Sequence, residues 1–123
     1  MPAAKTIPVI GFAGRANSGK TTLVEKVISA FTKQGLRVAA IKHVHHPFDV
    51  DVPGKDTHRH KLAGAANVIL ASRERVAMVK DTPKEYSLDD IVSRYVDDAD
   101  LVIVEGFKTA PIPKIEVYTR LSG

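Results

Sequence analysis

The chain has 123 residues, of which 44% are hydrophobic, and carries a formal net charge of +4 at pH 7. This length predicts a single globular domain over residues 1–123. The lack of cysteine excludes a disulfide framework and thiolate metal sites, and the lack of a long apolar run or signal peptide predicts a cytoplasmic protein with no membrane partner. The dispersed basic residues argue against nucleic acid as a partner and fit a phosphate-bearing ligand better.

The first predicted element is an apolar strand at Val9–Ala13 that leads into a glycine-framed loop. Residues 14–21 read GRANSGKT, which matches the P-loop pattern G-x-x-x-x-G-K-[ST] at every fixed position. Gly14 and Gly19 let the backbone N–H groups turn inward around a phosphate at the positive end of the following helix. We expect Lys20 to reach the β- and γ-phosphates and the Thr21 hydroxyl to bind Mg²⁺.

Helices and strands alternate after this loop. A helix is predicted from Lys20 to about Gln34, where Gly35 ends it. Asp56 or Thr57 is expected to cap a short helix further along. The remaining predicted elements are a long loop at His43–Lys55, helices at His58–Leu62 and Ser87–Tyr95, and strands at Leu36–Lys42, Asn67–Ala71, Arg75–Val79 and Pro113–Tyr118. Residues 87–91 resemble a capping arrangement at the start of their helix, and the three residues between Ala71 and Arg75 predict a hairpin.

A strand at Leu101–Gly106 begins with four apolar residues, three of them β-branched. Such a run is typical of a strand that is buried on both faces of a parallel sheet. Because ligands gather at the carboxyl ends of strands in α/β sheets, we expect Glu105 to lie across from Thr21 and to bind Mg²⁺ through water or orient an attacking water. The order of elements predicts an α/β fold, a three-layer P-loop NTPase domain with a mostly parallel sheet.

All five histidines lie within eighteen residues and have aspartates among them. This cluster is open to three interpretations: a transition-metal site, a polar loop bonded to itself and to solvent, or a set of groups that face a γ-phosphate or another anion. The basic side chains nearby favour the anion interpretation. The histidines are His43, His45, His46, His58 and His60, the aspartates are Asp49, Asp51 and Asp56, and the basic residues are Lys42, Lys55, Arg59 and Lys61.

Three segments together resemble the MobB family of molybdopterin-guanine dinucleotide biosynthesis: GRANSGKTTLVEKVI, IKHVHHPFDVDVPGKDTHRHKLAGA and LVIVEGFK. The resemblance implies a GTP-binding, usually homodimeric accessory protein with weak Mg²⁺-dependent GTPase activity, which works beside the guanylyltransferase MobA. It implies catalytic roles for Lys20 and Glu105 and metal binding by Thr21 and Glu105. The implied nucleotide contacts are Gly14, Arg15, Ala16, Asn17, Ser18, Gly19, Lys20, Thr21 and Thr22, with His43 and Asp56 from the neighbouring loop.

Two features depart from the family pattern. Members commonly continue beyond the strand equivalent to residues 114–117 with a further segment and strand, whereas this chain ends at Gly123, so we expect that segment to be absent. No N/T-K-x-D motif, which reads the base in ordinary G proteins, occurs in the sequence. Guanine preference therefore follows from the resemblance alone. Arg15 also occupies the position where dimeric relatives often place a lysine that reaches into the partner's site.

Three functions are compatible with these residues. The first is a nucleoside triphosphatase in which Glu105, or an aspartate from the loop over residues 49–56, steers the attacking water. The second is an adapter whose P-loop holds GTP or a molybdopterin phosphate for delivery to a transferase. The third is a metal-insertion NTPase chaperone that uses the His-rich loop beside the P-loop. The resemblance favours the adapter.

Overall fold

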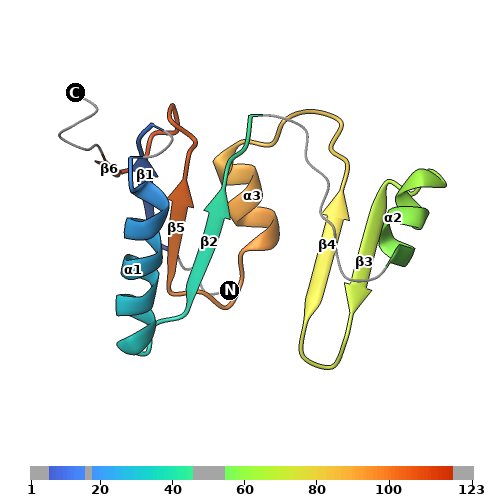
Figure 1. Cartoon of the computed structure of the whole chain (residues 1–123), viewed down its shortest axis with the longest axis horizontal. Coiled ribbons are helices and arrows are strands. Elements are labelled where there is room, and N and C mark those ends of the chain that lie inside the picture. The colour runs from blue at the N-terminus through green and yellow to red at the C-terminus, as the bar shows by residue number, and fades with distance from the viewer. Residues whose placement is uncertain (1–5, 16–17, 46–54, 118–123) are drawn as a thin grey trace. The chain divides into compact units, whose positions relative to one another are not determined.

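The computed structural model describes residues 6–15, 18–45 and 55–117, with residues 55–58 described by their backbone only. These residues belong to two compact units (Figure 1). The first unit comprises residues 1–45 and 87–123, and the second unit comprises residues 46–86. The expectation of one domain over residues 1–123 stays a prediction. Within the described ranges, no helix combines the length and the apolar character that crossing a bilayer requires.

A four-stranded parallel sheet forms the centre of the first unit. Its strands are, in spatial order, β2 (Val38–Lys42), β5 (Leu101–Glu105), β1 (Val9–Ala13) and β6 (Lys114–Glu116). The register pairs Phe12 of β1 with Glu105 of β5, and Glu105 with Lys42 of β2. The ends of these three strands therefore meet side by side, at what we call the carboxyl edge of the sheet.

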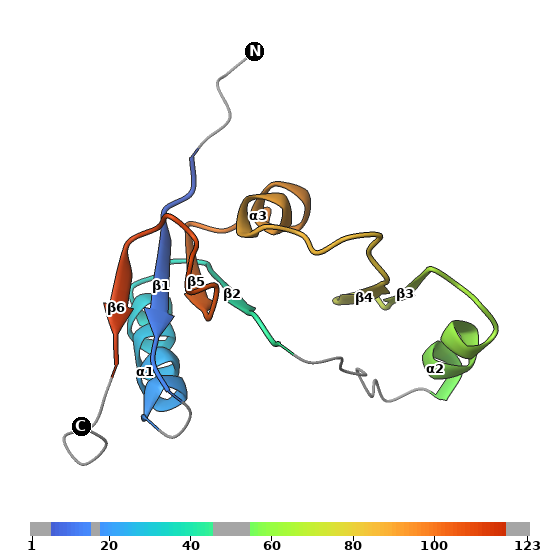
Figure 2. The ribbon, with the colours of Figure 1, turned by 90° about the horizontal axis from the view of Figure 1, so that it is seen from above.

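One helix covers each face of this sheet, which gives the unit three layers (Figure 2). On one face, α1 (Lys20–Lys33) packs against Phe12, Leu101 and Ile103. On the other face, α3 (Leu88–Tyr95) packs through Leu88 against Val102 and Val104. Because successive residues of a strand point to opposite faces, the apolar run of β5 fills both cores. This arrangement confirms the predicted α/β fold with a parallel sheet.

The start of α3 is fixed by a reciprocal pair of hydrogen bonds. The Ser87 hydroxyl accepts a hydrogen bond from the Asp90 N–H at 3.1 Å, and the Asp90 carboxylate accepts one from the Ser87 N–H at 3.0 Å. Each bond satisfies a backbone donor that the first turn of a helix leaves without an intrahelical partner. The capping arrangement predicted at residues 87–91 is therefore confirmed.

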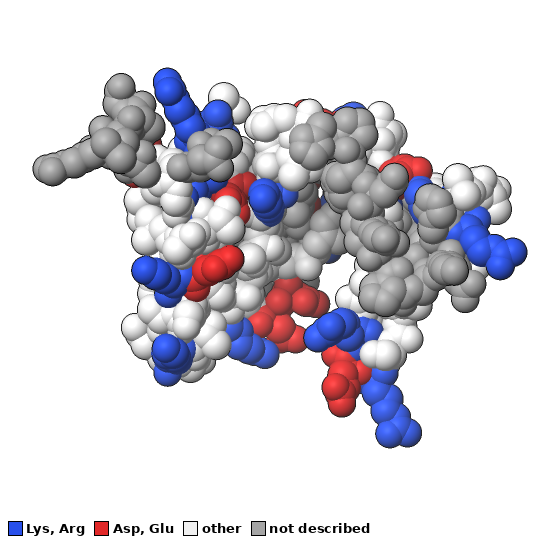
Figure 3. Space-filling model, viewed as in Figure 1, with Lys and Arg blue, Asp and Glu red and all other residues white. Residues whose placement is uncertain are grey.

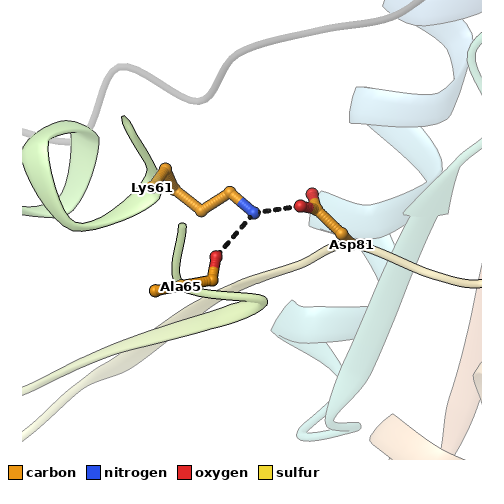
Figure 4. A network of polar contacts seen from close by, with 3 residues as sticks. All are labelled: Lys61, Ala65 and Asp81. Carbon is orange, nitrogen blue, oxygen red and sulfur yellow. Dashed lines mark hydrogen bonds and ion pairs between the residues drawn. The ribbon is translucent and has the colours of Figure 1, made fainter. Parts of the chain in front are cut away.

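The second unit contains a helix and a hairpin. The helix α2 spans Lys55–Leu62, and strands β3 (Asn67–Ala71) and β4 (Val76–Lys80) pair antiparallel. Lys61 links the two parts of the unit, because its ammonium pairs with the Asp81 carboxylate and donates to the Ala65 carbonyl at 3.1 Å (Figure 4). The predicted hairpin is confirmed, although β4 begins at Val76 instead of Arg75, whose carbonyl accepts the Ser72 N–H within the turn.

The strand β4 ends at Lys80 instead of Val79, β5 ends at Glu105 instead of Gly106, and boundaries of α2, β2 and α1 also differ from the prediction. The helix α2 begins at Lys55, so the expected cap at Asp56 or Thr57 is wrong and both residues lie inside the helix. Its first turn contains no apolar residue, and periodicity therefore gave no signal there. The strand β2 begins at Val38 instead of Leu36, because the Leu36 N–H donates a hydrogen bond to the Phe31 carbonyl at the end of α1. The helix α1 itself ends at Lys33, with Gln34 as its cap.

The last strand, β6, begins at Lys114, and the Pro113 carbonyl before it accepts the Gly11 N–H at 2.9 Å. The predicted end of that strand at Tyr118 lies outside the described residues. On the face shown in Figure 3, basic and acidic side chains are interspersed over the first unit.

Candidate functional site

The P-loop connects β1 to α1 at the carboxyl edge of the sheet, and its two glycines are needed for different reasons. A Cβ atom on Gly14 would overlap the Val117 carbonyl oxygen and lie 2.9 Å from the Ser18 hydroxyl oxygen. Gly14 is therefore required for space. Gly19 has open space around it but a φ of +86°, in the left-handed region that favours glycine. The two ends of the loop therefore carry glycine for the reasons that the sequence pattern predicts.

The amino end of α1 offers donors that the described residues leave available to an anion. Gly19 is the N-cap, no side chain caps the helix in the described part of the chain, and its first turn carries no acidic residue. The Ser18 hydroxyl is also buried there, at 6% residue exposure, without a hydrogen-bond partner among the described residues. A buried hydroxyl without a partner costs about 1–3 kcal/mol. This end of the helix therefore fits a phosphate group, which would accept hydrogen bonds from these donors.

Lys20 lies over this loop. Its ammonium donates a hydrogen bond to the Gly14 carbonyl at 3.0 Å, which draws the side chain back across the turn from the first residue of α1. The side chain is half-buried, so a positive charge is held beside the loop's N–H groups. Such a charge adds to the attraction that the helix end exerts on an anion.

Thr21 and Glu105 meet across the carboxyl edge, as the sequence predicted. The Thr21 hydroxyl donates to a Glu105 carboxylate oxygen at 2.8 Å, although the two residues are 84 positions apart in the chain. Glu105 is only 8% exposed, because β5 is flanked on both sides by other strands. A hydroxyl and a buried carboxylate are both hard oxygen ligands, and they therefore fit Mg²⁺.

A second group of residues lies where β2 and β5 end. The His43 N–H donates to the Glu105 carbonyl at 2.9 Å, and the His43 ring stacks on the Phe107 ring with centroids 4.2 Å apart. Between them, Gly106 has a φ of +95°, and Phe107 itself has a φ of +54°. The sequence indicated Glu105–Gly106 but missed Phe107, because a left-handed phenylalanine runs against backbone preference and leaves no local pattern.

The structure brings together seven of the predicted site residues at the carboxyl edge: Gly14, Ser18, Gly19, Lys20, Thr21, His43 and Glu105. Arg15 is exposed beside Gly14, and Thr22 is exposed in the first turn of α1. Ala16 and Asn17 lie outside the described residues. Asp56 belongs to α2 in the second unit, and its side chain lies outside the described part of the chain.

The histidine cluster is only partly described. His43 and His45 make an edge-to-face ring contact with centroids 4.7 Å apart. His46, Asp49 and Asp51 lie outside the described residues, as does the side chain of His58. Among the side chains that are described, no group of three or more histidines and carboxylates lies close enough to hold a metal ion. The transition-metal interpretation therefore gains no support from the described part of the chain.

Comparison with known proteins gives a consistent result. Residues 9–123 match the family model described as MobB, molybdopterin guanine dinucleotide synthesis protein B. The chain is 50% identical over 115 residues to a molybdopterin-guanine dinucleotide biosynthesis adapter protein of Haemophilus influenzae, covering 93% of this chain and 65% of that protein. It is 45% identical over 120 residues to the protein of the same description from Escherichia coli, covering 95% and 69%.

A solved structure agrees with these sequence relatives. The crystal structure of Bacillus subtilis MobB superposes with a TM-score of 0.76 at 25% identity, over 92% of this chain and 69% of that one. The chain thus spans about two thirds of the length of the curated relatives that it matches.

Proposed function

This chain belongs to the MobB family, and we propose that it is a GTP-binding adapter of molybdopterin guanine dinucleotide biosynthesis. The observation that carries the proposal is the set of contacts at the carboxyl edge, in which Lys20 lies over the Gly14 carbonyl and Thr21 donates to Glu105. The relatives' descriptions as adapter proteins support the pathway. In this proposal, residues 1–123 act as one P-loop nucleotide-binding domain in the cytoplasm.

Phosphate recognition in this proposal depends on fixed donors rather than on covalent chemistry. The N–H groups from Gly14 to Thr22 and the Lys20 ammonium hold the phosphates, and the Ser18 hydroxyl gains a partner in place of its unpaired buried state. The Ser18 hydroxyl, the Lys20 ammonium and the described N–H groups are already in place, because the two glycines and β1 fix this part of the loop. Binding therefore requires little ordering of the described part of the loop.

Thr21 and Glu105 would hold Mg²⁺ at this edge, and the ion would supply positive charge against the β- and γ-phosphate oxygens. The roles of the protein residues are electrostatic. Lys20 balances charge on the phosphates, and Glu105 accepts a hydrogen bond from the Thr21 hydroxyl or from a water near the terminal phosphate. In this proposal hydrolysis is weak and Mg²⁺-dependent, and it accompanies binding.

The proposed partners follow from the family. We expect the loaded chain to act with a MobA-type guanylyltransferase, with molybdopterin as a further ligand of the complex. We also propose a homodimer in which the exposed Arg15 reaches toward the partner's site. A guanidinium suits that role because it binds phosphate oxygens with two parallel hydrogen bonds.

The first test is binding of GTP, ATP, GDP and ADP with Mg²⁺, measured by calorimetry on the wild type and on Lys20→Ala. Hydrogen bonds to charged groups are worth about 1.5–3 kcal/mol, so we expect Lys20→Ala to weaken GTP binding by about 10- to 150-fold. Lys33→Ala is the matched control, because it removes an exposed lysine from the far end of the same helix. Absent binding of both triphosphates, or equal loss in the two variants, would contradict the proposal.

A second test separates the adapter from the enzyme. Glu105→Gln keeps the acceptor for the Thr21 hydroxyl but removes the negative charge. We expect this variant to bind GTP, to lose Mg²⁺-dependent hydrolysis and still to support formation of the dinucleotide cofactor with MobA added. Loss of cofactor formation in step with loss of hydrolysis would favour the enzyme instead.

A further inference from the structure

Two consecutive left-handed residues follow the buried carboxylate at the end of β5. Gly106 has a φ of +95° and Phe107 a φ of +54°, and only the first is a residue that adopts this conformation freely. Residues that are held in such sparsely populated conformations gather at functional sites, where surrounding contacts compensate for the strain. The contacts that hold Phe107 therefore indicate what this turn positions.

Those contacts converge on His43 at the end of the neighbouring strand. The Phe107 ring lies nearly parallel to the His43 ring, with centroids 4.2 Å apart and an angle of 20° between the planes. Phe107 also packs against the buried cluster that contains Val102 and Val104. Gly106 is in close contact with the same histidine, because a Cβ atom there would lie 3.0 Å from the His43 Cβ and 3.2 Å from its carbonyl oxygen.

The same turn is bonded to the phosphate-binding part of the site. The Glu105 carbonyl accepts the His43 N–H at 2.9 Å, and the Glu105 carboxylate accepts the Thr21 hydroxyl at 2.8 Å. His43 is thus fixed by a backbone hydrogen bond to β5 and by a ring stack on the residue two positions beyond Glu105. Figure 1 shows β1, β5 and β2 side by side in that order. The site therefore runs from the P-loop after β1, through Glu105 at the end of β5, to His43 after β2.

We propose that Phe107 is a positioning residue, whose ring holds His43 beside the terminal phosphate of a bound nucleoside triphosphate. This inference rests on the function proposed above. In that function the P-loop binds the β-phosphate, so groups beyond Glu105 lie on the side of the γ-phosphate. An imidazole fixed there donates a hydrogen bond to a triphosphate but has nothing to bind in a diphosphate. Phe107 therefore sets the discrimination between the two nucleotides.

The test compares the dissociation constants of GDP and of a non-hydrolysable GTP analogue with Mg²⁺, measured by calorimetry on the full chain. The main variant is Phe107→Leu, which keeps apolar volume against the Val104 cluster but removes the flat ring. Phe107→Tyr restores the ring, and His43→Ala removes the group that the ring positions. The stack of an aromatic pair predicts that Phe107→Leu lowers the preference for the triphosphate analogue by about 2- to 12-fold.

Three further results are expected. The GDP dissociation constant stays within about twofold of wild type, since the P-loop is unchanged. Phe107→Tyr regains the wild-type preference. The double variant that combines Phe107→Leu with His43→Ala loses no more of the preference for the triphosphate analogue than His43→Ala alone, because the two residues act as a unit.

Equal weakening of GDP and the analogue in Phe107→Leu would show that the ring merely supports the fold, and an unchanged preference would show that it has no role; either result overturns the inference. Failure of the proposed function gives a different result. In that case the wild type binds neither nucleotide, or Lys20→Ala binds both as the wild type does. Far-ultraviolet circular dichroism on each variant confirms that the compared chains are folded.

Discussion

Gly14 of the P-loop and Gly35 at the end of α1 allow the need for space and the need for backbone freedom to be measured separately. Gly14→Ala places a Cβ atom against the Val117 carbonyl, which is backbone and is held by the Val117 N–H bond to the Ala13 carbonyl at 2.7 Å. Because backbone cannot swing aside like a side chain, either this hydrogen bond breaks or the loop shifts. Gly35→Ala, at the end of α1, meets nothing within 4 Å and tests only a φ of +86°.

The expected cost of Gly14→Ala combines two effects. Overpacking costs about 1–3 kcal/mol and loss of the backbone hydrogen bond about 0.5–1.5 kcal/mol. We therefore expect the free energy of unfolding to fall by about 1.5–4.5 kcal/mol. Gly35→Ala should cost about 1–2 kcal/mol, which is the penalty for a Cβ atom in left-handed backbone.

Urea denaturation followed by far-ultraviolet circular dichroism measures both costs, provided that the slope with urea stays the same in each variant. GTP binding then separates the two glycines by function, because Gly14→Ala displaces the loop whereas Gly35→Ala lies at the opposite end of the helix. A cost for Gly14→Ala that is no larger than the cost for Gly35→Ala would refute the argument from the Val117 contact.

Three other substitutions test single contacts. Ser18→Ala removes a buried hydroxyl that has no partner among the described residues, so the unfolding free energy without nucleotide should stay level or rise by up to about 1–3 kcal/mol in urea denaturation. Ser87→Ala breaks the capping box of α3 and should lower the free energy of unfolding by about 1 kcal/mol in urea denaturation. Ser93→Ala is the control on the same helix. Gly106→Ala adds a Cβ atom in left-handed backbone and also brings that atom into close contact with His43. The free energy of unfolding in urea should therefore fall by more than the roughly 1–2 kcal/mol that a left-handed Cβ atom costs by itself.

The sequence predicted best where one local pattern determines one local structure. The P-loop glycines, the buried run of β5 and the Ser87 cap are all local signals, and all lie where expected. The contact between Thr21 and Glu105 is not local, but it follows from a general rule, because the ends of neighbouring parallel strands share one edge. Knowledge of the fold class was therefore enough to predict it.

The features that were missed depend on tertiary contacts. The sequence around Phe107 does not indicate left-handed backbone, because this conformation is held by the ring stack on His43 and by packing against the cluster that contains Val104. The clash between a Gly14 Cβ atom and the Val117 carbonyl was equally hidden, because it depends on how β6 lies beside β1. The start of α2 was missed for the opposite reason, since its polar first turn has no apolar period to read.

The second unit lies, in the sequence, between β2 and β5. These two strands are parallel neighbours, and the crossover that connects them also contains α3. A crossover of about a dozen residues is enough to join two parallel strands. The connection over residues 43–100 is roughly four times that length, which corresponds to about two doublings. Loop-closure entropy grows only with the logarithm of length, at about 0.6 kcal/mol per doubling, so this insertion costs the first unit about 1.2 kcal/mol. Length changes within the insertion therefore have little thermodynamic effect on the sheet, and the carboxyl edge with Glu105 is free to stay constant while the inserted segment diverges.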